Sequence, residues 1–229
     1  MNQRILVWDL PTRVFHWSLA ASFGVAYLTA ESESLHLIHL ICGYLFFALI
    51  GFRLLWGLAG SRHARFTSFV RGPAAVVGYL RSLMQGRPQH FTGHNPAGAI
   101  AVVLLLLLGT ATAVSGWLTL NQVGGETFEE LHEALATGML ALVVIHILGV
   151  VVSSRLHREN LAAAMVTGRK SGSETESIRN GHGIIAVLLA AALTLFAWGL
   201  AQGKLPALLD PAAIAAEIDD GAHRDKDDD

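Results

Sequence analysis

The stretch of residues 128–154, FEELHEALATGMLALVVIHILGVVVSS, constrains this chain more than any other. It has the length and apolarity of a membrane-spanning helix, yet it carries two histidines, His132 and His146. Fourteen residues separate them, so both imidazoles leave nearly the same helix face, roughly 21 Å apart along the axis. One metal ion cannot bridge that distance, whereas two sites stacked through a bilayer can. We therefore expect each histidine to bind one haem iron; the alternative is that neighbouring helices satisfy two polar residues.

The composition places the chain in the membrane. Of 229 residues, 52% are apolar and only 15% are charged, whereas a soluble domain has about a quarter charged residues. Cys42 is the only cysteine, and no CxxCH motif occurs, so an intramolecular disulfide, a covalently attached c-type haem and a thiolate-bound cluster are not expected. Any haem must be non-covalent, which favours haem b. Nothing in the sequence indicates nucleic-acid binding.

Five apolar runs have the length of membrane spans. We expect an all-α integral membrane protein, in which a four-helix transmembrane bundle binds two haems and a fifth, C-terminal transmembrane helix follows. The fifth run is at the short limit for a span. The expected spans are residues 14–30, 35–59, 97–120, 128–154 and 183–200.

The segments between the spans differ in charge. Residues 60–93 contain five arginines and no acid, and Pro73–Met84 within them shows the spacing of a surface-lying amphipathic helix. From Lys204 onward the tail has eight acidic residues against three basic ones, and Asp210–Pro211 predicts a short helix there. We expect a dihaem cytochrome b domain at 1–170, a polar linker at 171–182, an additional transmembrane helix at 183–202 and an acidic periplasmic tail at 203–229.

The basic residues predict the orientation. Segments 60–93 and 155–170 are strongly basic, and cytoplasmic loops carry the excess of Lys and Arg. The loops that contain Glu31, Glu33, Glu126, Glu129 and Glu130 then face outward. With five spans, we expect a multi-pass membrane protein with its N-terminus in the cytoplasm and its C-terminus on the outer side, which for a bacterial inner membrane is the periplasm.

This orientation gives each intramembrane histidine a depth. His16 begins a helix that starts inside, and His39 begins one that starts outside. The helix of residues 128–154 runs inward, so His132 is outer and His146 is inner. The expected pairs are His16 with His146 on the inner iron and His39 with His132 on the outer iron. Two imidazoles fill both axial positions of a haem iron, which favours electron transfer over oxygen chemistry.

Three neighbouring residues bear on these sites. Gly43 lies one turn after His39, and its missing side chain lets a flat porphyrin approach the backbone. That favours His39 over the nearby His36 as the ligand, without excluding His36. Arg53, near the end of the second span, can pair with a haem propionate or extend to lipid phosphates at the membrane surface.

The other histidines lie in loops or at span ends, where a solvated surface role is the default expectation. His94 and Asn95 are exceptions, because polar groups at the mouth of a helix can hold a quinone carbonyl. The remaining five are His63, His90, His157, His182 and His223.

Four motifs, in order, resemble the bacterial cytochrome b561 and nickel-hydrogenase b-type cytochrome family. They are VWDLPTRVFHW, HLICGYLFFALIGFRLLWGLAG, GHNPAGA and LHEALATGMLALVVIHILGV, within residues 5–170. The resemblance implies a four-helix core that binds two b haems through histidines matching His16, His39, His132 and His146. The extra His36, the fifth span and the acidic tail depart from the family pattern.

The resemblance implies electron exchange between the membrane quinone pool and a redox partner in a respiratory chain. Periplasmic cytochrome c and hydrogenase subunits are the partners that it implies, and quinone oxidoreductase activity is an open question. The outward acidic tail can dock a basic partner or serve only as a solubilising end. Two alternatives remain: a transporter or channel that uses histidines for protons or metal ions, and a membrane anchor subunit of an oxidoreductase.

Overall fold

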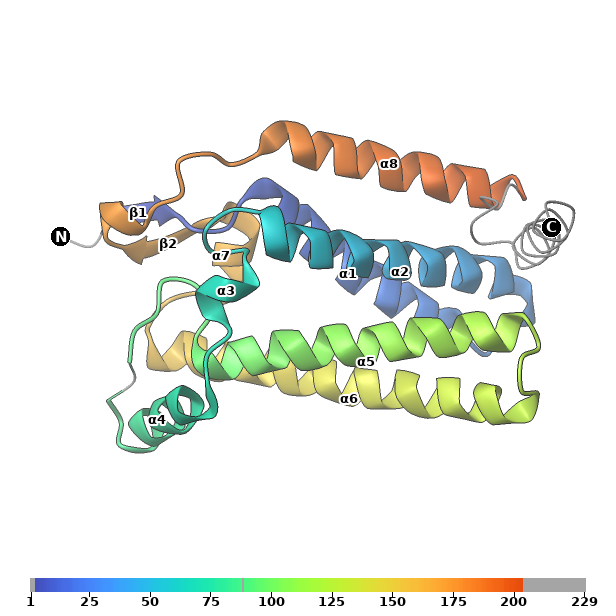
Figure 1. Cartoon of the computed structure of the whole chain (residues 1–229), viewed down its shortest axis with the longest axis horizontal. Helices are drawn as coiled ribbons and strands as arrows, with labels where there is room; N and C mark the ends of the chain where they lie inside the picture. Colours follow the sequence, from blue (N-terminus) through green and yellow to red (C-terminus); the bar gives the residue numbers. More distant parts are fainter. Residues whose placement is uncertain (1–2, 88, 204–229) are drawn as a thin grey trace, which may run out of the picture.

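The computed structural model describes residues 3–87 and 89–203, and the chain is mostly helical (Figure 1). Five long helices run side by side and alternate in direction along the chain. Short elements fill the connections: η1 (Glu33–Leu35), α3 (Phe66–Phe69), α4 (Pro73–Met84), α7 (Leu161–Thr167) and η2 (Glu174–Glu176). The long helices are α1 (Leu10–Thr29), α2 (His36–Ala59), α5 (Pro96–Leu120), α6 (Glu126–Leu156) and α8 (Gly183–Ala201).

Four helices in the described part of the chain are long and apolar enough to cross a membrane. They lie at Glu33–Ala59, Pro96–Leu120, Glu126–Leu156 and Gly183–Ala201, so this is an integral membrane protein. The expected first span does form a helix of 20 residues, but α1 is not among these four. Its Arg13, His16 and several hydroxyl side chains make it less apolar than the others.

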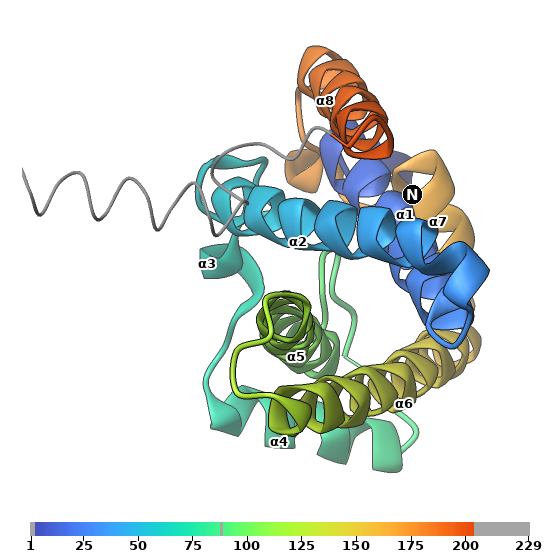
Figure 2. The same cartoon turned by 90° about the vertical axis from the view of Figure 1, so that its right-hand side faces the viewer.

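Two helix pairs build the bundle. Viewed along the helices, α1 with α2 forms one layer and α5 with α6 the other, while α8 lies outside α1 and α2 (Figure 2). The layers meet where α2 packs on α5. A Cβ atom at Gly109 of α5 would lie 3.0 Å from Phe46 and 3.1 Å from Ile50 of α2, so this glycine permits the close approach. The central core takes one or more buried side chains from each of these four helices: Phe23, Phe46, Ile50, Leu106 and Met139.

Two of the long helices, α1 and α5, begin where the sequence provides a side-chain cap. Asn95 accepts a hydrogen bond from the Gly98 amide at 2.7 Å, with Pro96 at the first position of α5, as predicted. Asp9 caps α1 in the same way through the Thr12 amide, at 2.7 Å. The surface helix predicted at Pro73–Met84 is confirmed as α4, with both bounds as expected.

A small β-ribbon corrects the all-α expectation. β1 (Gln3–Leu6) pairs antiparallel with β2 (Arg169–Gly172), with Gln3 opposite Gly172. The segment expected as a linker therefore begins inside β2, and it continues to bind the N-terminal strand, since the Ile178 amide donates to the Leu6 carbonyl at 2.9 Å. The ribbon pairs the segment before α1 with the segment between α7 and α8. The expected tail helix at Asp210–Pro211 and the rest of the acidic tail beyond residue 203 lie outside the described residues.

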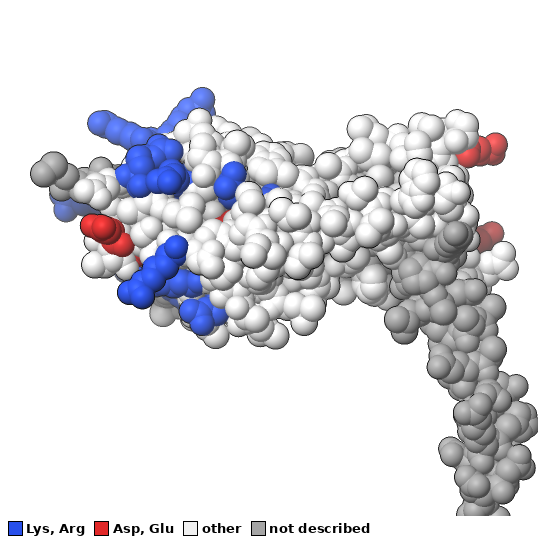
Figure 3. All heavy atoms as spheres, turned by 90° about the horizontal axis from the view of Figure 1, so that it is seen from above, with Lys and Arg blue, Asp and Glu red and all other residues white. Residues whose placement is uncertain are grey.

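The described basic residues gather at one end of the molecule, together with a few acidic ones, and the opposite end carries acidic residues alone (Figure 3). The basic end, near β1, β2 and α4, holds every described Lys and Arg, among them Arg62, Arg71, Arg155 and Arg169. The acidic end is formed by the connection before α2 and the start of α6. It carries six glutamates and no Lys or Arg in the described chain: Glu31, Glu33, Glu126, Glu129, Glu130 and Glu133.

Candidate functional site

The structure brings His39 and His132 together near the acidic end. His39 lies in the first turns of α2 and His132 in the second turn of α6, and both are half-buried. Their ring centres are 6.2 Å apart and their planes are perpendicular, at 89°. Two imidazoles that bind one metal from opposite sides, each about 2 Å from it, have ring centres about 6 Å apart. The observed separation fits bis-histidine ligation of one iron.

Both rings are held by hydrogen bonds that leave one nitrogen available. His39 Nδ1 donates to the Ala26 carbonyl at 2.8 Å, and His132 Nδ1 donates to the Thr112 carbonyl at 2.9 Å. The Ser115 hydroxyl lies 3.2 Å from the same His132 nitrogen. When Nδ1 carries the hydrogen, Nε2 presents its lone pair, and such an outer hydrogen bond is the usual partner of a metal-bound histidine. The pair is therefore in the tautomer that a haem iron requires.

Gly116 makes room for the His132 ring. A Cβ atom there would lie 2.7 Å from His132 Cε1 and 3.0 Å from Nδ1, closer than atoms in contact allow. Gly116 lies on α5 beside Thr112 and Ser115, one turn from the former. The same face of α5 therefore supplies both the hydrogen-bond acceptor for the imidazole and the space that it occupies.

We expect Gly116→Ala to weaken haem binding at the His39–His132 site by about 10- to 100-fold, the usual effect of disturbing a metal ligand's outer partners. The added methyl group pushes the ring away from the Thr112 carbonyl. Haem retention during dialysis, followed by the Soret band, measures the effect. Gly51→Ala is the matched control, because a Cβ atom at Gly51 meets nothing within 4 Å. Equal haem retention in the two variants would contradict this role for Gly116.

The structure separates the two histidines of the second span. His36 is exposed, and its ring stacks nearly parallel on His39 at 6.3 Å and 12°. Only His39 faces His132. A Cβ atom at Gly43, one turn after His39, would meet nothing within 4 Å, so there is open space beside the backbone where a porphyrin edge was expected.

His16 and His146 lie nearer the basic end, on α1 and α6. Their imidazoles are close enough to interact electrostatically, although α1 and α6 make no extensive contact. Both are half-buried, and His16 Nδ1 is a buried atom without a hydrogen-bond partner. The ring of Trp17 packs edge-on to His16 at 5.0 Å. This pair is held more loosely than His39 and His132, with a polar atom left for a partner that the protein chain does not supply.

Arg53 and His146 share His94 as an electrostatic neighbour. Arg53 is 3% exposed, and its guanidinium lies 4.8 Å from the centre of the Phe66 ring. Its Nη1 is buried without a hydrogen-bond partner. A buried donor without an acceptor is costly, so this atom suits a carboxylate, such as a haem propionate. The structure does not support extension of Arg53 to the membrane surface, because the side chain is enclosed.

The surface role expected for the loop histidines is wrong for His63, and the Nδ1 atom of His94, which was excepted from that expectation, is buried as well. His63 is 8% exposed, and its Nε2 donates to the Glu176 carbonyl at 2.8 Å. His94 packs between Trp8 and Phe69, with ring centres at 4.7 and 4.5 Å, and its buried Nδ1 has no partner. Burial lowers the pKa of His94 to about 3, with further lowering by Arg53. His94 is thus a neutral ring next to Arg53.

The quinone hypothesis for His94 and Asn95 stays a prediction. The Asn95 side-chain oxygen caps α5, and its amide nitrogen is the group that can donate to a quinone carbonyl. The buried Nδ1 of His94 has no partner, and its electrostatic neighbours include Arg53 and His146. We therefore group His94 with the His16–His146 site.

Sequence reasoning missed Asp9. It is 1% exposed, and besides capping α1 it accepts hydrogen bonds from Trp56 Nε1 at 3.1 and 3.3 Å. Asp9 thereby joins the start of α1 to the last turn of α2, and its charge also interacts with Arg53. The signal was present in the sequence, since an aspartate two residues before Pro11 is a typical cap. No sequence pattern indicated that Trp56, which lies 47 residues further along the chain, would donate to Asp9.

The histidines come in pairs, without clusters for a bare metal ion. Within residues 3–87 and 89–203, no three His, Cys, Asp or Glu side chains come close enough to bind one. Two imidazoles suit an iron whose other four ligands come from a porphyrin. The donor set therefore fits haem better than a transported metal ion.

Comparison with known proteins agrees with this reading. The model of the family described as prokaryotic cytochrome b561 matches residues 7–168. A probable Ni/Fe-hydrogenase B-type cytochrome subunit of Rhodobacter capsulatus is 23% identical over 213 residues, covering 73% of this chain and 81% of that protein. The same subunit of Rhizobium leguminosarum bv. viciae is 22% identical over 221 residues, covering 76% and 92%. No solved structure matches the chain.

Proposed function

Since this chain belongs to the prokaryotic cytochrome b561 family, we propose that it is a dihaem b-type cytochrome that carries electrons between the membrane quinone pool and a redox partner. Membership in the family entails a membrane-bound b-type cytochrome. The observation that carries the proposal further is the facing pair His39 and His132, each fixed through Nδ1 to a backbone carbonyl. That arrangement serves a six-coordinate iron.

The residue roles follow from the two pairs. Haem iron supplies one-electron chemistry when it is bound. His39 and His132 hold the outer iron, and His16 and His146 hold the inner one. Arg53 and His94 offer their unpartnered nitrogens to the propionates of the inner haem, and Gly43 leaves room for the outer porphyrin. These four imidazoles would each supply one nitrogen to a haem iron, two to each haem, and the haems would then serve electron transfer.

The charge distribution supports the orientation. The basic end faces the cytoplasm by the positive-inside rule, which places the N-terminus inside and the end of α8 outside. In this arrangement α1 crosses the membrane despite its polar residues, because it packs against α2 and α8. The protein is then a multi-pass component of the bacterial inner membrane. Residues 1–170 form the haem-binding domain, and α8 with the tail 203–229 is an addition to it.

Two partners are compatible with the acidic end. Its six glutamates attract a basic surface, such as that of a periplasmic cytochrome c. The relatives are themselves described as Ni/Fe-hydrogenase cytochrome subunits, which favours a hydrogenase-type subunit at this end of the protein.

The visible spectrum and haem content of the purified protein test the proposal. We expect two haems b per chain in a pyridine haemochrome assay, and their reduction by decylubiquinol under anaerobic conditions. A colourless protein would favour a transporter or a haem-free anchor subunit instead. If the protein contains two haems that decylubiquinol does not reduce, it is a cytochrome, but the proposed electron exchange with quinone is wrong.

A further inference from the structure

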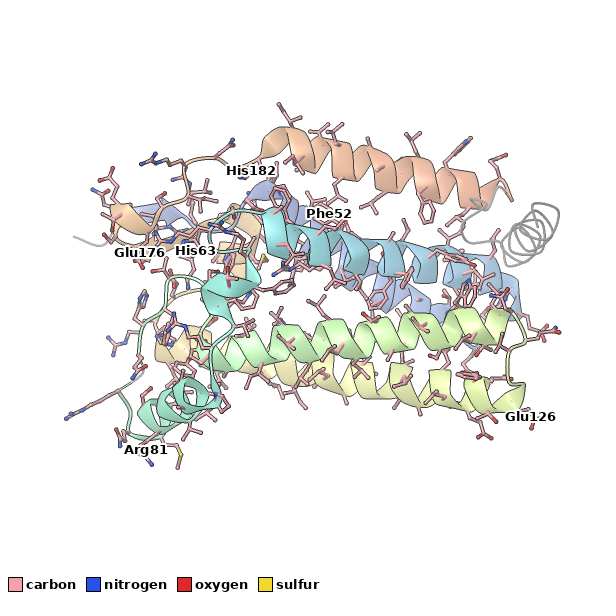
Figure 4. All side chains as sticks on the ribbon, in the orientation of Figure 1. Phe52, His63, Arg81, Glu126, Glu176 and His182 are labelled. Carbon is pink, nitrogen blue, oxygen red and sulfur yellow. The ribbon has the colours of Figure 1, made fainter. Side chains whose placement is uncertain are left out.

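A polar cavity of about 180 Å³ lies at the basic end, apart from the paired histidines. Its walls come from the connection after α2, from α3 and from the loop 90–94 before α5. The charged side chains in its lining are Arg62, Arg71 and Glu176, joined by His63, His90 and His94. Figure 4 shows His63 and Glu176 close together beside the β-ribbon. Of these side chains, His94 alone has a role in the proposed electron transfer, and the two arginines have none.

The cavity carries a net positive charge. Arg62 and Arg71 face one carboxylate, Glu176, which is already engaged by the Thr92 hydroxyl at 2.7 Å. That hydrogen bond is the main reason that the pKa of Glu176 is lowered, so its charge is present throughout the neutral range. Burial lowers the pKa of His63, which is therefore neutral. The excess charge rests on two arginines, the side chains best suited to bind phosphate oxygens.

The walls of the cavity are fixed before any ligand binds. His63 is bonded to the Glu176 carbonyl, and Lys170 Nζ donates to the Phe91 carbonyl at 3.2 Å, which ties the loop to β2. The Arg71 guanidinium lies over the Phe91 ring, 4.7 Å from its centre. A preformed site loses little conformational entropy on binding.

The surrounding helices place the cavity at the depth of lipid headgroups. Its lining lies just beyond Ala59, where α2 ends, and before Pro96, where α5 begins. The adjacent α4 buries Tyr79, which packs toward His157 of the bundle, and exposes apolar Val77, Leu80 and Met84 on its opposite face. Apolar side chains exposed on one face of a short helix at a membrane-protein end are typical of a helix that lies in the interface.

From these observations we propose that this cavity binds the phosphate group of an anionic phospholipid, with Arg62 and Arg71 as its ligands. Basic cavities at the cytoplasmic ends of membrane helices are suited to such headgroups. Soluble phosphate shares the same chemistry. The membrane depth of the cavity and the lipid-facing side of α4 favour the lipid as its source.

Native mass spectrometry of the haem-loaded protein in detergent tests the proposal, with phosphatidylglycerol and phosphatidylcholine of identical acyl chains as probes. We expect one phosphatidylglycerol to bind at least about tenfold more tightly than phosphatidylcholine, because charge-assisted hydrogen bonds are strong. Arg71→Gln alone and Arg62→Gln with Arg71→Gln should each weaken phosphatidylglycerol binding by about tenfold or more. Arg71→Gln is the safer variant, since Arg62 also donates to the Thr175 carbonyl.

Arg81→Gln is the matched control. Arg81 lies on α4, at the edge away from His63 and Glu176, and it does not line the cavity (Figure 4). The Arg81→Gln protein should bind phosphatidylglycerol within about twofold of the unaltered protein, because the charge that it loses does not line the cavity. An unchanged haem spectrum confirms folding of every variant. Equal weakening by Arg81→Gln and Arg71→Gln, displacement of the lipid by equimolar inorganic phosphate, or displacement by decylubiquinone would each overturn the lipid assignment.

Discussion

Replacing His39 with alanine should remove one of two haems and leave the other in place. His39 faces His132 at the distance required for one iron, and its Nδ1 is already bound to the Ala26 carbonyl. No other described imidazole apart from His36 lies close to this pair. Loss of an axial ligand from a non-covalent haem abolishes its retention during purification. The ratio of haem to protein, by pyridine haemochrome and amino-acid analysis, should fall by about half.

His36→Ala is the control for this experiment. His36 is exposed and stacks on His39 without facing His132, so its removal should leave the haem content unchanged. The opposite result, with His36→Ala losing a haem and His39→Ala keeping both, would make His36 the ligand. His132→Ala should reproduce the effect of His39→Ala, because both act on the same iron. His39→Ala combined with His146→Ala should be colourless.

Much of the helical architecture could be predicted because apolar length is a local signal. The predicted span of residues 35–59 agrees with the bounds of α2 to within one residue. The predicted cap Asn95 and first helical residue Pro96 are those of α5. The amphipathic spacing of Pro73–Met84 gave α4 with its bounds. The β-ribbon was missed because its strands have four residues each and lie more than 160 positions apart. Strands this short show no periodicity, and their pairing depends on the finished bundle.

The histidine pairing followed from sequence because spacing along one helix fixes relative depth. The fourteen residues between His132 and His146, with alternating helix directions, were enough to match His39 to the former. The atoms that orient the rings were beyond prediction. The acceptors at Ala26 and Thr112 are backbone carbonyls inside helices, and any residue type has one. The same limit applies to the burial of His63 and His94, which depends on loops folding over the bundle.

Asp9→Ala should produce the largest loss of stability of any single loop substitution at the basic end. Three stabilising contributions disappear together: the cap of α1, the hydrogen bonds from Trp56, and the negative charge nearest the buried Arg53. Removing one partner of a buried charged group costs about 3–5 kcal/mol. For a chain of this length, each kcal/mol lowers the melting temperature by roughly 2–4 °C. We therefore expect the melting temperature of the haem-loaded protein, followed by the Soret band, to fall by roughly 10 °C.

Asn95→Ala separates the cap from the other contributions. Asn95 also caps a long helix through a hydrogen bond of 2.7 Å, but it has no partner like Trp56, so its loss should cost only about 1 kcal/mol. Asp9→Asn keeps the shape and an acceptor oxygen while removing the charge, and it should fall between the two. If the melting temperature of the Asp9→Ala protein is no lower than that of the Asn95→Ala protein, then Asp9 acts only as a cap. The link from α1 through Trp56 to Arg53 would then contribute nothing to holding the inner haem site together.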